Sequence, residues 1–133
     1  QFAFYEPDSD YLPHRHVPNA VVYTGTHDND TARGWFARLS HEEKRRVTDY
    51  FGGDGSRIEW DLIRAAFESV CDRAIVPLQD ILGLGSEARM NDPALPGGNW
   101  GWRAGAGAFR PDLAARLRRL ASLTGRAPAP PTS

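Results

Sequence analysis

One short segment constrains the fold of this chain more than any other. Residues 21–26 are rich in β-branched and aromatic side chains and predict a buried strand over residues 19–26. The next residues, 27–30, are His, Asp, Asn and Asp, so four hydrogen-bonding side chains follow the carboxyl end of that strand. Functional residues of parallel α/β sheets and barrels gather at this end of the strands. We therefore expect His27 and Asp28 to belong to a catalytic or ligand-binding site.

The remainder of the chain alternates between predicted strands and helices. Short apolar runs predict strands at residues 1–4 and 74–78, and the Gly-rich stretch 79–109 is typical of a long ligand-binding loop. Apolar residues at helical spacing, with Ser-x-x-Glu capping boxes at Ser40 and Ser56, predict the helices. Their expected ranges are 28–39, with an N-cap among Asp28, Asn29 and Asp30, and then 40–51, 56–73 and 111–125.

This order of elements predicts an α/β fold in which parallel strands alternate with helices. An eight-stranded α/β barrel takes roughly 250 residues, and the 133 residues present suffice for one domain or part of one. The first residues resemble a chain that was cut inside a strand. The Pro/Ala-rich tail at residues 126–133 is expected to be disordered.

Composition argues against nucleic-acid and membrane partners. The chain has 16 basic and 17 acidic residues, and its formal net charge of -1 provides no field for nucleic acid or an anionic membrane. No apolar run approaches the roughly 18 residues of a membrane span. The single cysteine, Cys71, excludes an intrachain disulfide and fits a reducing compartment, so we expect a cytoplasmic protein. Its position on the apolar face of a predicted helix favours a buried thiol.

Taken alone, His27 and Asp28 are compatible with a metal pair, a catalytic dyad or a hydrogen-bonding clamp for a polar ligand. His14 and His16 could complete a metal site if their loop folded back, but the carboxylate and amide neighbours suit hydrogen bonding equally well. A His-Asp doublet also occurs in metal-dependent phosphohydrolases. That fold places the doublet on helices, whereas residues 21–26 favour a strand.

Sugar-processing enzymes are a third class that this cluster suggests. They use clustered carboxylates around an oxocarbenium-like transition state, and aromatic rings that pack against the apolar face of a sugar. Phe2, Tyr23 and Trp35 are aromatic residues near the cluster in the predicted fold. Packing in the core is an alternative role for each of them, and for Trp35 it is the favoured one.

Three motifs then follow one another along the chain. They are VYTGTHDNDT with the nearby Gly34-Trp35, at residues 22–35, then PLQDILGLGSEARMN at 77–91 and GNWGWR at 98–103. Together they resemble the motifs of 4-α-glucanotransferases of the amylomaltase or disproportionating-enzyme family, glycoside hydrolase family 77. Residues 1–4 and 12–14 match as well, so the resemblance covers nearly the whole chain before the tail.

The resemblance implies a retaining α-glucan transferase with an Asp nucleophile, a Glu acid/base and a second Asp that stabilises the transition state. Asp28 matches this second Asp, and His27 matches the adjacent sugar-binding His. Asn91 matches a substrate-contacting Asn, and Phe2 an aromatic residue beside the cleavage site. The family's nucleophile and acid/base lie upstream of the segment that matches Gln1, so this chain is expected to lack both.

The implied architecture is the C-terminal portion of a (β/α)8 TIM barrel, an incomplete barrel of the last two to three strands with their helices, over residues 1–125. The implied partners are maltooligosaccharides, α-1,4-glucans and the remainder of the barrel upstream of Gln1, without a cofactor or metal. A non-catalytic carbohydrate-binding or partner module derived from the same fold is the alternative function.

Overall fold

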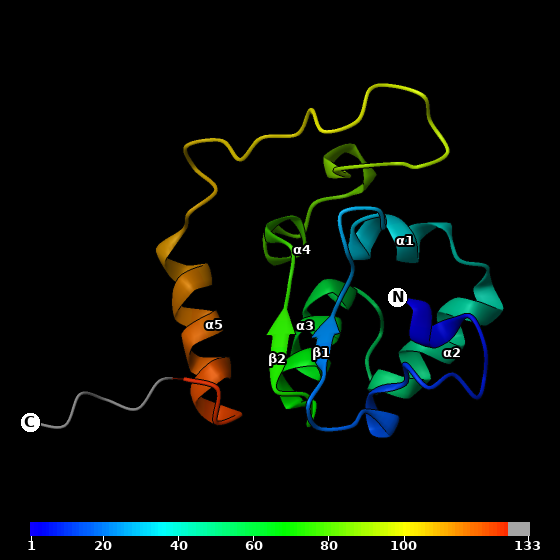
Figure 1. Ribbon diagram of the computed structural model, residues 1–133, viewed down its shortest axis with the longest axis vertical. Helices are drawn as coiled ribbons and strands as arrows, with labels where there is room; N and C mark the ends of the chain where they lie inside the picture. Colours follow the sequence, from blue (N-terminus) through cyan, green and yellow to red (C-terminus); the bar gives the residue numbers. More distant parts are fainter. Residues whose placement is uncertain (128–133) are drawn as a thin grey trace, which may run out of the picture.

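The computed structural model describes residues 1–127, in which helices lie behind and to both sides of a two-stranded parallel sheet (Figure 1). The mixture of helices and strands predicted from the sequence is confirmed. None of the described helices is both long and apolar enough to span a membrane. In chain order the elements are the 3-10 helices η1 (Phe2–Phe4) and η2 (Pro13–Arg15), strand β1 (Val21–Tyr23), helices α1 (Ala32–Arg38), α2 (His41–Phe51) and α3 (Ile58–Glu68), strand β2 (Arg73–Ile75), helix α4 (Leu78–Leu82), the 3-10 helix η3 (Ser86–Ala88) and helix α5 (Pro111–Leu123).

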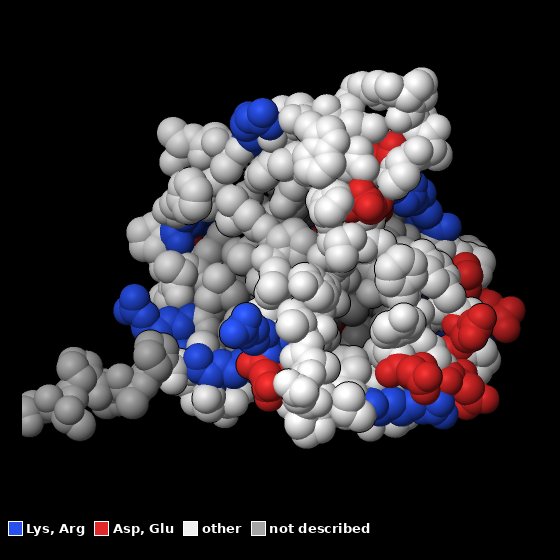
Figure 2. All heavy atoms as spheres, viewed as in Figure 1, with Lys and Arg blue, Asp and Glu red and all other residues white. Residues whose placement is uncertain are grey.

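The sheet is open on one face. β1 pairs in parallel with β2, with Val22 opposite Ala74, and α1, α2 and α3 form the crossover between the two strands. Side chains alternate between faces along a strand, so Val21, Tyr23 and Ile75 are exposed while Val22 is partly buried. In the view onto the open face of the sheet, charged side chains lie mostly toward the edges of the molecule (Figure 2). On the sheet itself, Arg73 of β2 is exposed on the same face as Ile75.

Two apolar cores lie among the helices. In the first, Phe4 packs against Trp35 with ring centroids 6.0 Å apart, and Val47 of α2 is completely buried. Core packing of Trp35 is therefore confirmed. The second core joins α3 to α5, with Trp60 and Leu120 at its centre. The apolar stripe expected on the last helix faces this core through Leu113, Leu117 and Leu120.

The strand expected at residues 1–4 is wrong, because this segment forms η1. Consecutive Ala3 and Phe4 are both buried, whereas a strand would turn them to opposite faces. The strand expected at 74–78 is also shorter than predicted. β2 ends at Ile75, and α4 follows inside the stretch that we expected to be a loop.

The two predicted capping boxes have different outcomes. At Ser40 the box is confirmed, since Ser40 Oγ accepts from the Glu43 backbone N–H and the Glu43 carboxylate accepts from the Ser40 N–H. At Ser56 the prediction is wrong, because α3 has Arg57 as its N-cap and no side-chain cap. The backbone N–H of Ser56 instead donates to Asp54 Oδ1 at 2.9 Å, which holds Ser56 in the preceding turn.

Two further helix ends differ from expectation. α1 has Thr31 as its N-cap, with Thr31 Oγ1 accepting from the Gly34 N–H, so none of residues 28–30 serves as the cap. α3 ends at Glu68, before the expected end at residue 73. Ser69 Oγ accepts from the Cys71 N–H at 3.1 Å and turns the chain toward β2. Cys71 is buried, as predicted.

The disordered tail was expected to begin at residue 126, and for Arg126 this is wrong. Its guanidinium donates to the backbone carbonyl oxygens of Phe67, Ser69, Cys71 and Asp72. These carbonyls lie at and after the C-terminal end of α3, where helices leave acceptors unsatisfied. Arg126 therefore fastens the segment after α5 to the end of α3 and to the residues that connect α3 to β2. The prediction for residues 128–133 lies outside the described residues.

Candidate functional site

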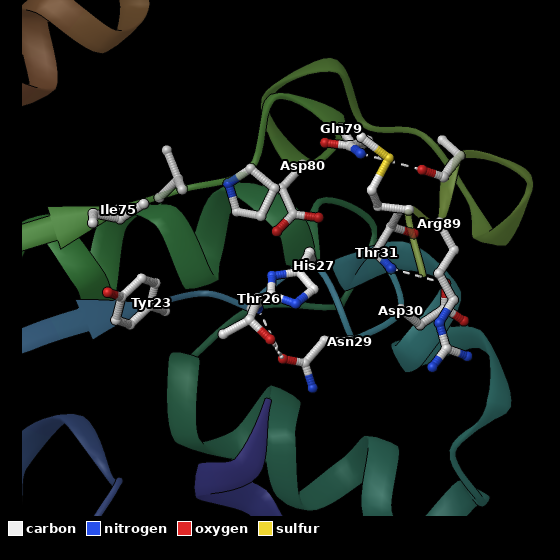
Figure 3. A pocket seen from close by; sticks show the side chains of 15 residues that line it. Tyr23, Thr26, His27, Asn29, Asp30, Thr31, Ile75, Gln79, Asp80 and Arg89 are labelled. Carbon is white, nitrogen blue, oxygen red and sulfur yellow. Dashed lines mark hydrogen bonds between the residues drawn. The ribbon is translucent and has the colours of Figure 1, made fainter. Parts of the chain in front are cut away.

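The carboxyl ends of β1 and β2 open onto a cavity of about 450 Å³ (Figure 3). Ligands of α/β proteins bind at this edge of the sheet. Its lining comes from both strand ends, the turn after β1, the start of α4 and the segment that follows η3. The lining includes Tyr23, Thr26, His27, Ile75, Gln79 and Arg89.

A tight turn projects His27 and Asp28 from the end of β1. Asn29 Oδ1 accepts hydrogen bonds from the backbone N–H and the hydroxyl of Thr26, at 2.8 and 3.0 Å. The backbone at Gly25 is closely packed before this turn, because a Cβ there would lie 2.9 Å from the Gln1 side-chain nitrogen and 3.3 Å from the Asn29 Cβ. The turn leaves the side chains of His27 and Asp28 58% and 47% exposed, so both can reach a ligand.

The two oxygens of the Asp28 carboxylate have different surroundings. Oδ1 accepts a hydrogen bond from Asn91 Nδ2 at 2.6 Å, and His27 Nε2 lies 3.2 Å from the same oxygen. No hydrogen bond within residues 1–127 involves Oδ2. The structure thus brings together three of the predicted site residues, from segments that are 63 positions apart. One oxygen is held in place, and the other is free to accept a hydrogen bond from a ligand.

Arg89 and Trp100 contact this group, although we did not select either of them from the sequence. Arg89 Nη2 donates to the backbone oxygen of Asp28 at 2.8 Å. The Trp100 ring lies beside the His27 imidazole, with centroids 5.2 Å apart and planes inclined by 37°. Both residues belong to the motifs at 77–91 and 98–103. The motifs were the available signal, but a residue type within a motif does not show which atoms it contacts.

Phe2 lies apart from the group formed by His27, Asp28 and Asn91. Its exposed ring packs near Tyr5 and Tyr11, with centroid distances of 5.7 and 6.4 Å. It lines a second, mostly apolar cavity of about 500 Å³, which shares the end of β1 with the first cavity. The predicted role of Phe2 beside the cleavage site stays a prediction.

The histidines of the preceding loop do not join the site. His14 Nδ1 lies 2.9 Å from the Tyr50 hydroxyl, and His16 Nδ1 lies 2.7 Å from Ser69 Oγ, toward the opposite end of β1. Over residues 1–127, no three His, Cys, Asp or Glu side chains are placed to share a metal ion. The geometry around Asp28 is that of a hydrogen-bonding site.

Two buried carboxylates, those of Asp80 and Asp30, hold the turn at residues 26–29 in place through hydrogen bonds on either side of it. Asp80, 1% exposed, accepts from Thr24 Oγ1 at 2.8 Å and from the Ala32 backbone N–H at 2.7 Å, and burial raises its pKa. Asp30 pairs with Arg38 at 2.7 Å and accepts from Ser86 Oγ at 2.7 Å. Asp80 thus ties the end of β1 to the start of α1. Asp30 ties the turn to η3.

Comparison with known proteins adds the following matches. The model of glycoside hydrolase family 77, described as 4-alpha-glucanotransferase, matches residues 1–107. The chain is 52% identical to the chloroplastic/amyloplastic 4-alpha-glucanotransferase DPE1 of Arabidopsis thaliana, over 95% of this chain and 23% of that protein. It is 45% identical to the 4-alpha-glucanotransferase of Clostridium butyricum, over 95% of this chain and 26% of that protein.

A solved structure has a similar fold. The amylomaltase of Streptococcus agalactiae in complex with acarbose superposes with a TM-score of 0.90 at 31% identity, over 96% of this chain and 26% of that one. The chain thus spans about a quarter of the length of the relatives it matches.

Proposed function

The chain belongs to the 4-alpha-glucanotransferase family, glycoside hydrolase family 77, and from this we propose that it is the C-terminal part of a retaining 4-α-glucanotransferase. The full-length enzyme transfers α-1,4-glucan segments to glucose or maltooligosaccharide acceptors through a covalent glycosyl-enzyme. This chain supplies the carboxylate that stabilises the transition state, Asp28, together with sugar-binding residues. The nucleophile and the acid/base come from the part of the barrel upstream of Gln1.

The state of the Asp28 carboxylate is the observation that carries this proposal. Asn91 and His27 contact Oδ1 and so fix the orientation of the carboxylate. Oδ2 can then accept a hydrogen bond from a sugar hydroxyl. In an oxocarbenium-like transition state, such hydrogen bonds strengthen, and a nearby negative charge offsets the positive charge on the sugar. Asp28 can therefore bind the transition state more tightly than the ground state without forming a covalent bond.

The open face of the sheet supports the upstream barrel as a partner. Val21, Tyr23 and Ile75 are exposed there, and within residues 1–127 each of β1 and β2 pairs along one edge only. Unpaired strand edges and exposed apolar faces are normally covered. The apolar cavity beside Phe2 adjoins the same face. We propose that the remaining strands of the barrel cover this surface and that residues 1–125 form its last strands and helices.

The substrate class follows from the site and from the relatives. The amylomaltase relative was solved with acarbose, and the cavity at the strand ends has a size suited to a small ligand. His27 lines this cavity, whereas Asp28 and Asn91 do not line it and contact each other beside His27. We propose that maltooligosaccharides and α-1,4-glucans bind at this edge of the sheet, in the cavity and against the neighbouring Asp28 and Asn91. The cytoplasmic location stays a prediction that is based on the single Cys71.

Incubation with maltotriose tests the division of labour between this chain and the rest of the enzyme. The 133-residue chain alone is expected to release no glucose and no longer oligosaccharides, because it lacks the nucleophile and the acid/base. The full-length enzyme is expected to form both, as measured by anion-exchange chromatography. Turnover by the isolated chain would show that a second carboxylate pair exists here and would contradict the proposal.

A non-catalytic carbohydrate-binding module is the second candidate function. It is favoured by the engagement of the neighbouring carboxylates of Asp30, Asp80 and Asp92 in hydrogen bonds or ion pairs within the fold. The reading frame upstream of Gln1 distinguishes the two. A frame that encodes a Glu-Asp-Leu-Gly-like strand end and an earlier Asp supports the enzyme, whereas a start codon near Gln1 supports the module.

A further inference from the structure

Arg89 joins the Asp28 turn to the segment at residues 91–92, which follows Arg89 in the chain. Its Nη2 donates to the Asp28 backbone oxygen at 2.8 Å, its Nε to the Asn91 oxygen at 2.9 Å, and its Nη1 to Asp92 Oδ2 at 2.9 Å. The side chain is only 19% exposed. The planar fork of a guanidinium suits this arrangement, because its donors point in fixed and divergent directions.

The segment after Arg89 forms a closed loop against the site. Asn99 closes it at one side, with Oδ1 accepting from the Asp92 N–H at 2.8 Å and Nδ2 donating to the Asp92 oxygen at 3.1 Å. The Trp100 N–H donates to the Met90 oxygen at 2.7 Å, and the Trp100 ring then lies beside His27. Trp100 has a φ of 63°, a strained value for a residue with a side chain. The surrounding hydrogen bonds keep it there.

Two consecutive carbonyl groups of the site are fixed from this loop. The Asn91 N–H donates to the His27 oxygen at 3.0 Å, and Arg89 donates to the next carbonyl, that of Asp28. The Arg89 charge is already matched by Asp92. Arg89 therefore acts on the backbone that carries the Asp28 carboxylate. Its hydrogen bonds do not involve that carboxylate.

We propose that Arg89 is a positioning residue that fixes the orientation of the Asp28 carboxylate through its backbone. The inference rests on the proposed function of Asp28. Catalytic groups act at full strength only in a narrow geometry, and a displacement of about 1 Å can cost about 10²-fold in rate. Without Arg89, the backbone oxygens of Asp28 and of Asn91 both lose a donor. The contact between Asn91 Nδ2 and Asp28 Oδ1 then joins two less constrained backbones, so the carboxylate loses its alignment while the sugar contacts of other residues remain.

The test compares Arg89→Ala, Arg89→Lys and the control Arg64→Ala in the full-length enzyme, with maltotriose as substrate. Arg64 is an exposed arginine on α3 that pairs with Glu68, away from the site. We expect Arg89→Ala to lower kcat by about 10²-fold with KM changed less than about twofold. Arg89→Lys is expected to recover part of kcat, because an ammonium can replace some of the donors. Arg64→Ala is expected to match the wild type.

The outcomes separate this inference from the proposed function. If Asp28→Asn retains wild-type kcat, the proposed function itself fails. If Asp28→Asn loses activity but Arg89→Ala behaves like Arg64→Ala, the role of Arg89 is wrong. A rise in KM at constant kcat would also overturn it, because it would indicate direct substrate binding. Rates are expressed per folded enzyme, quantified by near-ultraviolet circular dichroism, and a normal kcat on that scale counts against the proposal.

Discussion

Replacing Asp28 with Asn in the full-length enzyme is expected to lower kcat by about 10³-fold, a loss typical of removing one electrostatic stabiliser of a transition state. The amide has the same shape, and its oxygen can still accept from Asn91 Nδ2 as Oδ1 does now. What disappears is the negative charge that offsets the oxocarbenium-like centre. Initial rates of glucose release from maltotriose measure the effect. KM should change much less than kcat, because most ground-state contacts remain.

A matched control separates this effect from a general loss of charge. Asp8→Asn removes the charge of an exposed aspartate that pairs with Arg15 in the loop before β1. It is expected to leave kcat unchanged. Circular dichroism should show a native spectrum for both variants, since neither side chain is part of the core. A wild-type kcat for Asp28→Asn would exclude the stabilising role of this residue.

The sequence predicted where the side chains of His27 and Asp28 lie, for a physical reason. A β-branched run that ends in His27 and Asp28 can place those side chains only at the mouth of a strand, and β1 does so. Asn91 was identified through the resemblance alone. Its contact with Asp28 spans 63 positions, and no local pattern encodes a contact at that separation. Arg89 and Trp100 were missed for the same reason, since their roles depend on how a long loop closes.

The incorrect predictions share another cause, competition between local signals and tertiary contacts. Ser56 matches a capping box, yet its N–H is engaged by Asp54 and the helix begins after it. Phe2 and Phe4 alternate like a strand, but Ala3 and Phe4 are buried together. Arg126 stands in a Pro/Ala-rich tail, and only the folded structure brings the carbonyls at the end of α3 within its reach. Local sequence patterns do not contain these partners.

The buried Asp80 gives the largest expected effect on stability. Asp80→Ala leaves the Ala32 N–H and the Thr24 hydroxyl without their acceptor in a buried position, which should lower the free energy of unfolding by about 3 kcal/mol. Asp80→Asn is the matched control. Its amide oxygen can accept from Ala32 N–H and its amide nitrogen can donate to Thr24 Oγ1, so at neutral pH it should melt near the wild-type temperature. Thermal melting of the full-length enzyme measures both variants.

The pH dependence of these melts tests whether Asp80 is held as a buried charge. Burial raises the pKa of Asp80 in the folded state above its ordinary value of about 3.9. A raised folded-state pKa stabilises the fold fully below the unfolded value, and this contribution is lost as the pH rises through the folded value. Asn does not titrate, so Asp80→Asn should gain stability relative to the wild type as the pH increases from about 4 toward neutrality. A constant difference across that range would mean that the folded and unfolded pKa values are equal, with the hydrogen bonds from Ala32 and Thr24 offsetting the desolvation of the carboxylate.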